Sequence, residues 1–197
     1  MSYQVERVFS TPIYRSFVTD FDNIQKQLSE AVNDTTFTTN DNWGMTHFLS
    51  ENYGTINFHE EYDLSAFVSE LDVHIKRYCS EIRFPFRGYK ISSSWIALFE
   101  SGNYGHVHNH GSSDMSGTYY YQRDDSGGLK DGNIFFESPV YTAETSLCFR
   151  SSSGRVTVPS TTGNILLFPG WLKHGIMTNE TEHDRVSFSF DIIFDRH

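Results

Sequence analysis

The sequence predicts a mainly β domain in which helices precede an antiparallel sandwich or barrel. Between Tyr89 and Phe194, short runs rich in β-branched and aromatic residues are separated by Gly, Asp and Ser turns, as in antiparallel β proteins. Ahead of Pro85, apolar residues recur instead with the spacing of amphipathic helices. Aromatic residues make up 16% of the chain, a content that favours a compact β-rich interior over disorder.

At 197 residues, the chain is long enough for one ordinary domain with a hydrophobic core, and its length gives no reason to expect two. We expect residues 1–88 to form a helical and irregular support for a β core over residues 89–197. The two cysteines, Cys79 and Cys148, have no CxxC spacing, so the sequence predicts neither a zinc ribbon nor a disulfide framework.

The formal net charge of -10 argues against a broad nucleic-acid-binding surface, because phosphate contacts need clustered Lys and Arg. The N-terminal segment MSYQVERVFSTPIYRSF lacks the basic region and apolar run of a secretory signal. No window approaches the roughly 18 consecutive apolar residues of a membrane span. The sequence therefore predicts a cytoplasmic protein with no membrane partner, and it indicates no oligomeric state.

The N-terminal region contains one predicted edge strand and one modest helix. Val5–Phe17 has short apolar segments interrupted by Pro12, and proline cannot donate a hydrogen bond to an interior sheet ladder. Asn23–Val32 follows two aspartates and repeats an apolar residue every fourth position, which predicts a helix with an acidic start. Asn33–Tyr53 is rich in Thr, Asn and Asp and is interpreted as a loop with one short strand.

A longer helix is predicted from Tyr62 to Ile82. Its apolar positions follow i, i+3, i+4 spacing for five turns: Leu64, Phe67, Val68, Leu71, Ile75, Tyr78 and Ile82. His74 lies beside this stripe and is assigned no functional role.

The β core is predicted from seven runs: Tyr89–Phe99, Gly117–Gln122, Asn133–Phe136, Ser146–Arg150, Arg155–Val158, Asn164–Phe168 and Arg185–Phe194. The last run alternates polar and apolar residues in RVSFSF before becoming continuously apolar, so one face or end of that strand is buried. Trp95 and Phe99 are expected to pack at the boundary of the hydrophobic core rather than contact a substrate. The loop Asp124–Asp131 is interpreted either as a mobile lid or as a hairpin tip.

A histidine-rich run supplies the candidate metal ligands. His106, His108 and His110 occupy every second position, so in an extended strand they would share one face. Neutral imidazole binds iron, zinc and copper, and a site with two such ligands needs a third from elsewhere in the fold. His174, which follows the apolar run ILLFPGWLK, is the natural candidate. The alternative is a surface loop with incidental histidines, or a secondary metal trap.

Arg185 and Ser187 form a candidate anion site at the start of the last strand. Residues two apart on a strand face the same way, and a buried guanidinium beside a hydroxyl fits a carboxylate. The alternative is that Arg185 is a surface cation at a strand start.

Together these motifs resemble a known family. Gly102 six residues before His108, the His-x-His pair, SGTYYY, GNILLFPGWLKH and RVSFSF are similar to the double-stranded β-helix core of 2-oxoglutarate and Fe(II)-dependent oxygenases. Within that superfamily, the chain resembles the prolyl-hydroxylase-like oxygenases of bacteria and phages, which often begin with a segment like FSTPIY. The resemblance covers residues 91–194 well and the first ninety loosely, and it implies a jelly-roll, cupin-like core.

The resemblance also implies a ligand set for Fe(II). His108 and His174 match two of the iron ligands. Most of the superfamily has Asp or Glu at position 110, so His110 as third ligand removes one negative charge from the site. Asp114 is the alternative carboxylate ligand, and His106 would then be an outer or substrate-side residue.

By the same resemblance, Arg185 would pair with the distal carboxylate of 2-oxoglutarate, assisted by Ser187 and the Tyr120 hydroxyl. The implied reaction uses O2, converts 2-oxoglutarate to succinate and hydroxylates an unknown small-molecule or protein substrate, with a prolyl residue favoured by analogy. A phage-encoded enzyme would act in the host-cell cytoplasm.

Two other functions fit parts of the pattern. One is a cupin-type metal enzyme that does not use 2-oxoglutarate, and such a site has no need of Arg185. The other is a noncatalytic or zinc-binding β-sandwich interaction protein, since a fold does not imply an activity.

Overall fold

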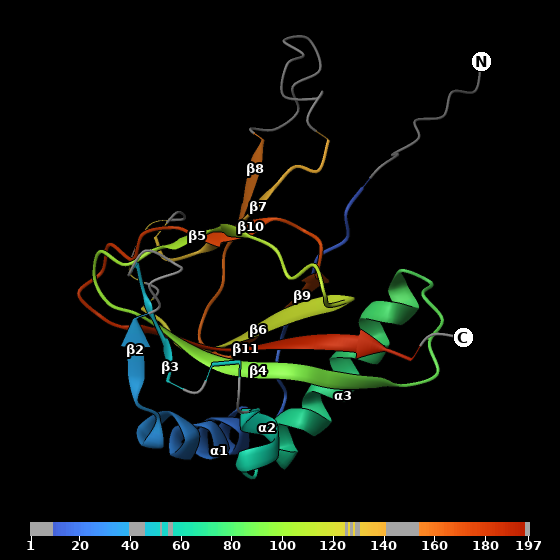
Figure 1. Ribbon diagram of the computed structural model, residues 1–197, viewed down its shortest axis with the longest axis horizontal. Coiled ribbons are helices and arrows are strands. Elements are labelled where there is room, and N and C mark those ends of the chain that lie inside the picture. The colour runs from blue at the N-terminus through green and yellow to red at the C-terminus, as the bar shows by residue number, and fades with distance from the viewer. Residues whose placement is uncertain are drawn as a thin grey trace.

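In the computed structural model, two antiparallel β-sheets face each other, and the helices cover the outer side of the larger sheet (Figure 1). The structure describes residues 10–39, 46–51, 53–54, 57–124, 126, 128, 131–140 and 154–195. The helices are α1 (Phe21–Asp34), α2 (Phe58–Glu61) and α3 (Ser65–Glu81). None of these described helices is long and apolar enough to cross a membrane.

The larger sheet contains strands from both halves of the chain. In spatial order its strands are β1 (Tyr14–Phe17), β9 (Asn164–Pro169), β6 (Met115–Gln122), β11 (Arg185–Phe194), β4 (Tyr89–Phe99), β3 (Phe48–Ser50) and β2 (Phe37–Thr39). The smaller sheet has the order β5 (Gly105–His108), β10 (His174–Ile176), β7 (Ile134–Glu137) and β8 (Arg155–Val158). From β4 onward the chain passes back and forth between the two sheets, which is the jelly-roll arrangement predicted from the sequence.

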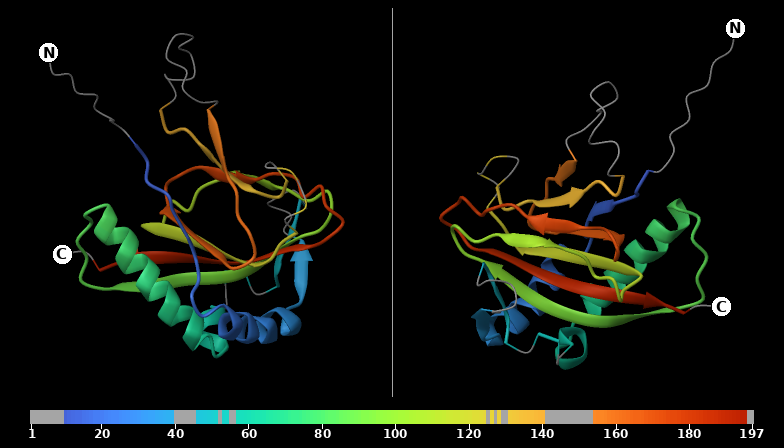
Figure 2. Two further views of the ribbon diagram at one scale, coloured as in Figure 1. Left: turned by 180° about the vertical axis from the view of Figure 1, so that it is seen from behind. Right: turned by 45° about the horizontal axis from the view of Figure 1, so that its top comes forward.

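Successive side chains of β11 point alternately to the hydrophobic core under the helices and to the space between the two sheets. Phe188 and Phe190 point to the helices, where Phe67 of α3 meets them at ring-centroid distances of 5.0 and 5.8 Å. All three rings are almost completely buried, and burying each stabilises the fold by about 2 kcal/mol. Because successive residues on a strand face opposite ways, the alternate residues Ser187 and Ser189 point into the space between the sheets. The helices therefore pack against the face of β11 that is turned away from the smaller sheet (Figure 2).

Gly117 on β6 allows the close packing of this core. A Cβ atom at this position would lie 2.5 Å from two ring carbons of Phe190 and 2.8 Å from the Leu166 carbonyl oxygen. We expect Gly117→Ala to lower the free energy of unfolding by about 1–3 kcal/mol, because this close-packed core has no room for a methyl group. Urea denaturation measures the effect. Gly128→Ala is the control, since no atom lies within 4 Å of that Cβ, and an equal loss in both variants would contradict the packing account.

Most sequence-predicted elements are confirmed. The two predicted helices are α1 and α3, and the runs at Tyr89–Phe99, Arg155–Val158 and Arg185–Phe194 match β4, β8 and β11 at both ends. The predicted edge strand is β1, which lies at one edge of the larger sheet, and its predicted part at residues 5–9 lies outside the described residues. The predicted strand at 146–150, with Cys148, also lies outside them.

Three differences concern short elements. The turn of helix α2 was not predicted, because four residues are too few to show a helical period. The described part of residues 33–53 contains two short strands, β2 and β3, rather than one. The loop of residues 124–131 is described only in part, so its role as a lid stays a prediction.

Candidate metal centre

A cavity opens between the two sheets, and both sheets supply its walls. From the larger sheet it is lined by Trp95, Ala97, Phe99, Ser116, Thr118, Arg185, Ser187 and Ser189, and from the smaller sheet and its turns by His108, His110, Ile134, His174 and Ile176. One end of the cavity is thus rich in imidazoles and another contains a guanidinium. Sequence-predicted candidates from three distant segments therefore share one cavity: His108 and His110, His174, and Arg185 with Ser187.

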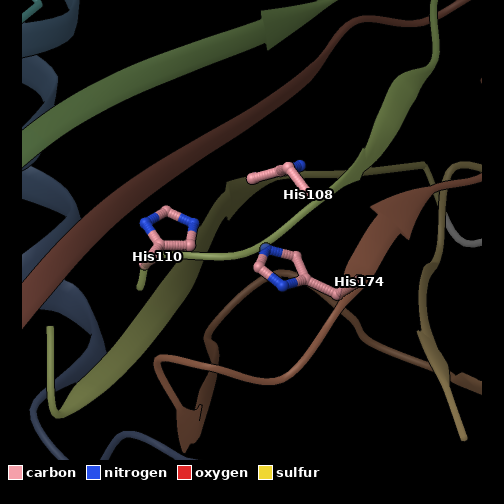
Figure 3. Close-up of side chains that lie close together, drawn as sticks. All are labelled: His108, His110 and His174. Carbon is pink, nitrogen blue, oxygen red and sulfur yellow. The ribbon is translucent and has the colours of Figure 1, made fainter. Parts of the chain in front are cut away.

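Three histidines gather in this cavity. His108 ends β5, His110 follows in the turn, and His174 begins β10, where it pairs in register with His108. One ring nitrogen from each lies within 4.8 Å of those of the others, and the rings surround a common space (Figure 3). Their donor set matches that of a metal ion bound by imidazoles.

Backbone acceptors fix the protonation of two of these rings. His108 Nδ1 lies 2.8 Å from the His106 carbonyl oxygen, and His174 Nδ1 lies 2.9 Å from the Leu172 carbonyl oxygen. A carbonyl oxygen can only accept, so both Nδ1 atoms donate, and each Nε2 keeps its lone pair. That is the tautomer in which a histidine binds a metal through Nε2.

A carboxylate fixes the third ring. His110 Nδ1 lies 3.0 Å from Asp191 Oδ1 and 3.1 Å from Asp191 Oδ2. Asp191 also accepts hydrogen bonds from the hydroxyls of Ser116, at 2.5 Å, and Ser93, at 3.2 Å. The Trp95 ring stacks on a face of the His110 ring, with the centroids 5.5 Å apart and an interplanar angle of 16°. The His110 ring is therefore held both by a hydrogen bond and by packing.

Burial lowers the pKa of three cavity histidines, His47, His108 and His174. It lowers the pKa of His174 well below its ordinary value of 6.5, and it lowers the pKa of His108 to about 4. His47, which stacks on Phe99 with ring centroids 4.7 Å apart, also has a pKa lowered to about 4, chiefly by burial. At neutral pH these rings are uncharged, so His108 and His174 need not lose a proton before a metal binds.

These shifts predict that acid destabilises the metal-free protein. The folded-state pKa values lie below the unfolded value of 6.5, so the unfolded chain binds more protons as the pH falls from 6.5 to 4. Between pH 7 and 5, His47 and His108 should each reduce the free energy of unfolding by about 1–2 kcal/mol. Urea denaturation in the presence of a chelator measures this loss. It should be smaller in His47→Gln, and a loss of equal size in that variant would contradict the assignment.

Arg185 is a buried cation at the other end of the cavity. Its side chain is 3% exposed, and its guanidinium lies over the rings of Phe99 and Tyr120 at 4.7 and 5.0 Å. It donates a hydrogen bond to Ser187 Oγ at 3.3 Å, and no carboxylate among the described residues forms an ion pair with it. Arg185 Nε and the Tyr120 hydroxyl are buried without a hydrogen-bond partner. Since an unpaired buried charge is costly, this end of the cavity suits an anion.

Two other candidates from the sequence lie elsewhere. The Asp114 carboxylate accepts a hydrogen bond from the Phe194 N–H at 2.9 Å and is not part of the histidine cluster. His106 is exposed and contacts Tyr104 edge-on at a centroid distance of 5.2 Å. Its side chain does not line the cavity, and its carbonyl oxygen is the group that contacts His108.

Sequence reasoning missed several cavity residues. Trp95 and Phe99 belong to a buried hydrophobic cluster, as expected, and they also line the cavity, because it reaches β4. His47 and Tyr53 also line it, from a segment interpreted mainly as loop. Asp191 could have been noticed, because it shares the strand parity of Arg185 and Ser187.

Comparisons with known proteins agree with this geometry. A family model described as "Putative 2OG-Fe(II) oxygenase" matches residues 93–191. No curated protein matches the sequence.

Among solved structures, HygX from Streptomyces hygroscopicus, with nickel and 2-oxoglutarate bound, is 13% identical, with a TM-score of 0.64 over 92% of this chain and 82% of that one. A Pseudomonas putida prolyl-4-hydroxylase is 10% identical, with a TM-score of 0.57 over 95% and 94% of the two chains. The nogalamycin epimerase SnoN, described as α-ketoglutarate dependent, is 14% identical, with a TM-score of 0.64 over 93% and 78%.

At such low identity these structures establish the fold alone, and they confirm the double-stranded β-helix core. The family model spans half of the chain and covers β6 to β10 completely. The chain therefore belongs to the 2OG-Fe(II) oxygenase family, whose cofactors are Fe(II) and 2-oxoglutarate.

Proposed function

We propose that this protein is a 2-oxoglutarate and Fe(II)-dependent dioxygenase that hydroxylates a C–H group of a small-molecule or protein substrate. One observation carries the proposal: a single cavity contains three imidazoles, each with a ring nitrogen within 4.8 Å of those of the others, and a buried guanidinium with no acidic partner among the described residues. A metal alone would leave Arg185 unexplained, and an anion alone would leave the histidines unexplained.

His108, His110 and His174 would hold the metal through their Nε2 atoms. The three Nδ1 atoms are engaged with acceptors, so the rings are already oriented before the metal arrives. Bound iron supplies the activation of O2 in this family. The protein's part is to keep three ligands on one side and to leave the other coordination positions free for cosubstrate and oxygen.

Arg185 would bind the distal carboxylate of 2-oxoglutarate. Its Nε and the Tyr120 hydroxyl are two of the buried donors without a hydrogen-bond partner in the described structure, and Ser187 Oγ lies beside the guanidinium. Burial strengthens a charge-assisted hydrogen bond, so these groups fit a dicarboxylate that reaches from the guanidinium toward the histidines.

The substrate would approach the aromatic wall of the cavity. Tyr53 and Trp95 meet edge-on at a centroid distance of 5.4 Å, and Trp95 in turn stacks on His110. This wall places apolar ring faces beside the proposed metal site, which suits a substrate that presents a compact apolar group such as a prolyl ring. The jelly-roll likeness to a prolyl-4-hydroxylase is compatible with that class.

Anaerobic titration of the purified protein with Fe(II) and then 2-oxoglutarate tests the proposed function. A weak visible charge-transfer band from the iron-bound keto acid should appear only when both are present. Absence of the band would contradict the proposal. Tight zinc or iron binding without any 2-oxoglutarate binding would identify instead a metal enzyme or interaction protein that does not use the cosubstrate.

A further inference from the structure

The three cavity histidines do not have equivalent partners. His108 and His174 donate their Nδ1–H to neutral backbone carbonyls, whereas His110 donates to a carboxylate. Both oxygens of Asp191 lie at almost the same distance from His110 Nδ1, 3.0 and 3.1 Å. The Asp191 side chain is 12% exposed, so little water screens its charge.

No Lys or Arg among the described residues forms an ion pair with Asp191. Its other partners are the hydroxyls of Ser93 and Ser116, which stabilise a carboxylate but carry no positive charge. A buried anion with only neutral donors is costly unless a cation lies nearby. The proposed metal position lies among the three histidines, where one ring nitrogen of each is within 4.8 Å of those of the others. A divalent cation bound there would be separated from the Asp191 carboxylate by the His110 imidazole.

We propose that Asp191 is a positioning residue that compensates the charge of the metal through His110. The inference rests on the proposed function. Three neutral imidazoles leave the whole positive charge of a divalent metal uncompensated by its direct ligands. An N–H to carboxylate hydrogen bond polarises the ring, strengthens Nε2 as a donor and fixes the ring's orientation. A carboxylate at position 110 would bring its negative charge into direct contact with the metal. Asp191 brings a negative charge to the same site, but with the His110 imidazole between the carboxylate and the metal.

The substitution Asp191→Asn removes the negative charge of the side chain and nearly preserves its shape. The amide has nearly the same size and keeps an oxygen that accepts from His110, but it carries no charge. We expect the affinity for Fe(II), or for Co(II) as its spectroscopic substitute, to fall about 10- to 100-fold. Anaerobic metal titration measures the change. Asp114→Asn is the matched control, because that carboxylate also accepts a hydrogen bond near β11 but lies outside the cluster, and it should bind metal like wild type.

The same substitution, made in a protein that also carries His110→Asp, tests the proposed mechanism. His110→Asp puts a carboxylate directly at the metal and removes the N–H that links position 110 to Asp191. Two carboxylates would then face each other, so adding Asp191→Asn should leave metal affinity unchanged or raise it. A purely structural role for Asp191 cannot produce that reversal. The inference is overturned if Asp191→Asn binds metal within twofold of wild type, or if it weakens binding equally in both backgrounds.

Thermal denaturation covers the case in which a variant is less stable. A smaller metal-induced rise in Tm for Asp191→Asn supports the inference. A lower metal-free Tm with an unchanged metal-induced rise overturns it, because Asp191 would then serve only the fold. The proposed function fails separately, if wild type itself gives no band with Fe(II) and 2-oxoglutarate. A normal wild-type band with an unaffected Asp191→Asn variant contradicts this inference alone.

Discussion

Arg185→Ala is expected to weaken 2-oxoglutarate binding at least about 100-fold, the range measured when one partner of a buried charge pair is removed. The variant loses the only buried guanidinium on this wall among the described lining residues, whereas the histidines and their acceptors are untouched. Fe(II) or Co(II) affinity should therefore stay within a few-fold of wild type. Isothermal titration with 2-oxoglutarate in the presence of an inert divalent metal measures the loss.

Arg155→Ala provides the control for Arg185. Arg155 is also an arginine on a strand, over the Phe135 ring at 4.6 Å, but it is largely exposed and pairs with Glu137 at the surface. Its removal should not change cosubstrate binding. Unchanged 2-oxoglutarate affinity in Arg185→Ala would exclude Arg185 as the anion site.

His174→Ala is expected to have the largest effect on the metal. His174 is 4% exposed, and its ring lies 4.4 Å from that of His108 and 5.2 Å from that of His110. Removing one of three ligands should cost more than the roughly 10- to 100-fold loss that follows from removing an outer hydrogen-bond partner. Metal content after anaerobic loading and gel filtration measures the result.

His106→Ala is the matched control for His174→Ala. Its ring is exposed and outside the cavity, and alanine keeps the backbone carbonyl that accepts from His108. This variant should load metal like wild type. If Asp114→Asn abolished loading while His110→Ala did not, the third ligand would be Asp114 rather than His110.

Much of the fold could be predicted because its main elements have strong local patterns. The alternation in RVSFSF defines β11, and the apolar stripe from Leu64 to Ile82 defines α3. Strands β5 and β10 are only four and three residues long and consist of Gly, His, Val and Ile without a clear period. Their pairing, which brings His108 opposite His174, depends on the assembled sheet.

Site residues that form an unusual local pattern could be predicted from the sequence. Site residues that meet only through the register of paired strands could not. Three histidines in five residues are conspicuous, and so is Arg185 two residues before Ser187. Asp191 contacts His110 across 81 residues of sequence, so only the register of β11 beside β4 and β6 brings them together. Strand parity alone also placed His106 with His108, although only His108 lines the cavity.

A crystal structure of the protein grown anaerobically with Fe(II) and 2-oxoglutarate is the most direct test of the proposed site. We expect iron bound to Nε2 of His108, His110 and His174 at about 2 Å, the usual metal–imidazole distance. We also expect the distal carboxylate of 2-oxoglutarate on Arg185, with Asp191 still on His110 Nδ1. Iron bound by Asp114 or by Asp191 itself, or 2-oxoglutarate bound away from Arg185, would contradict the proposed site.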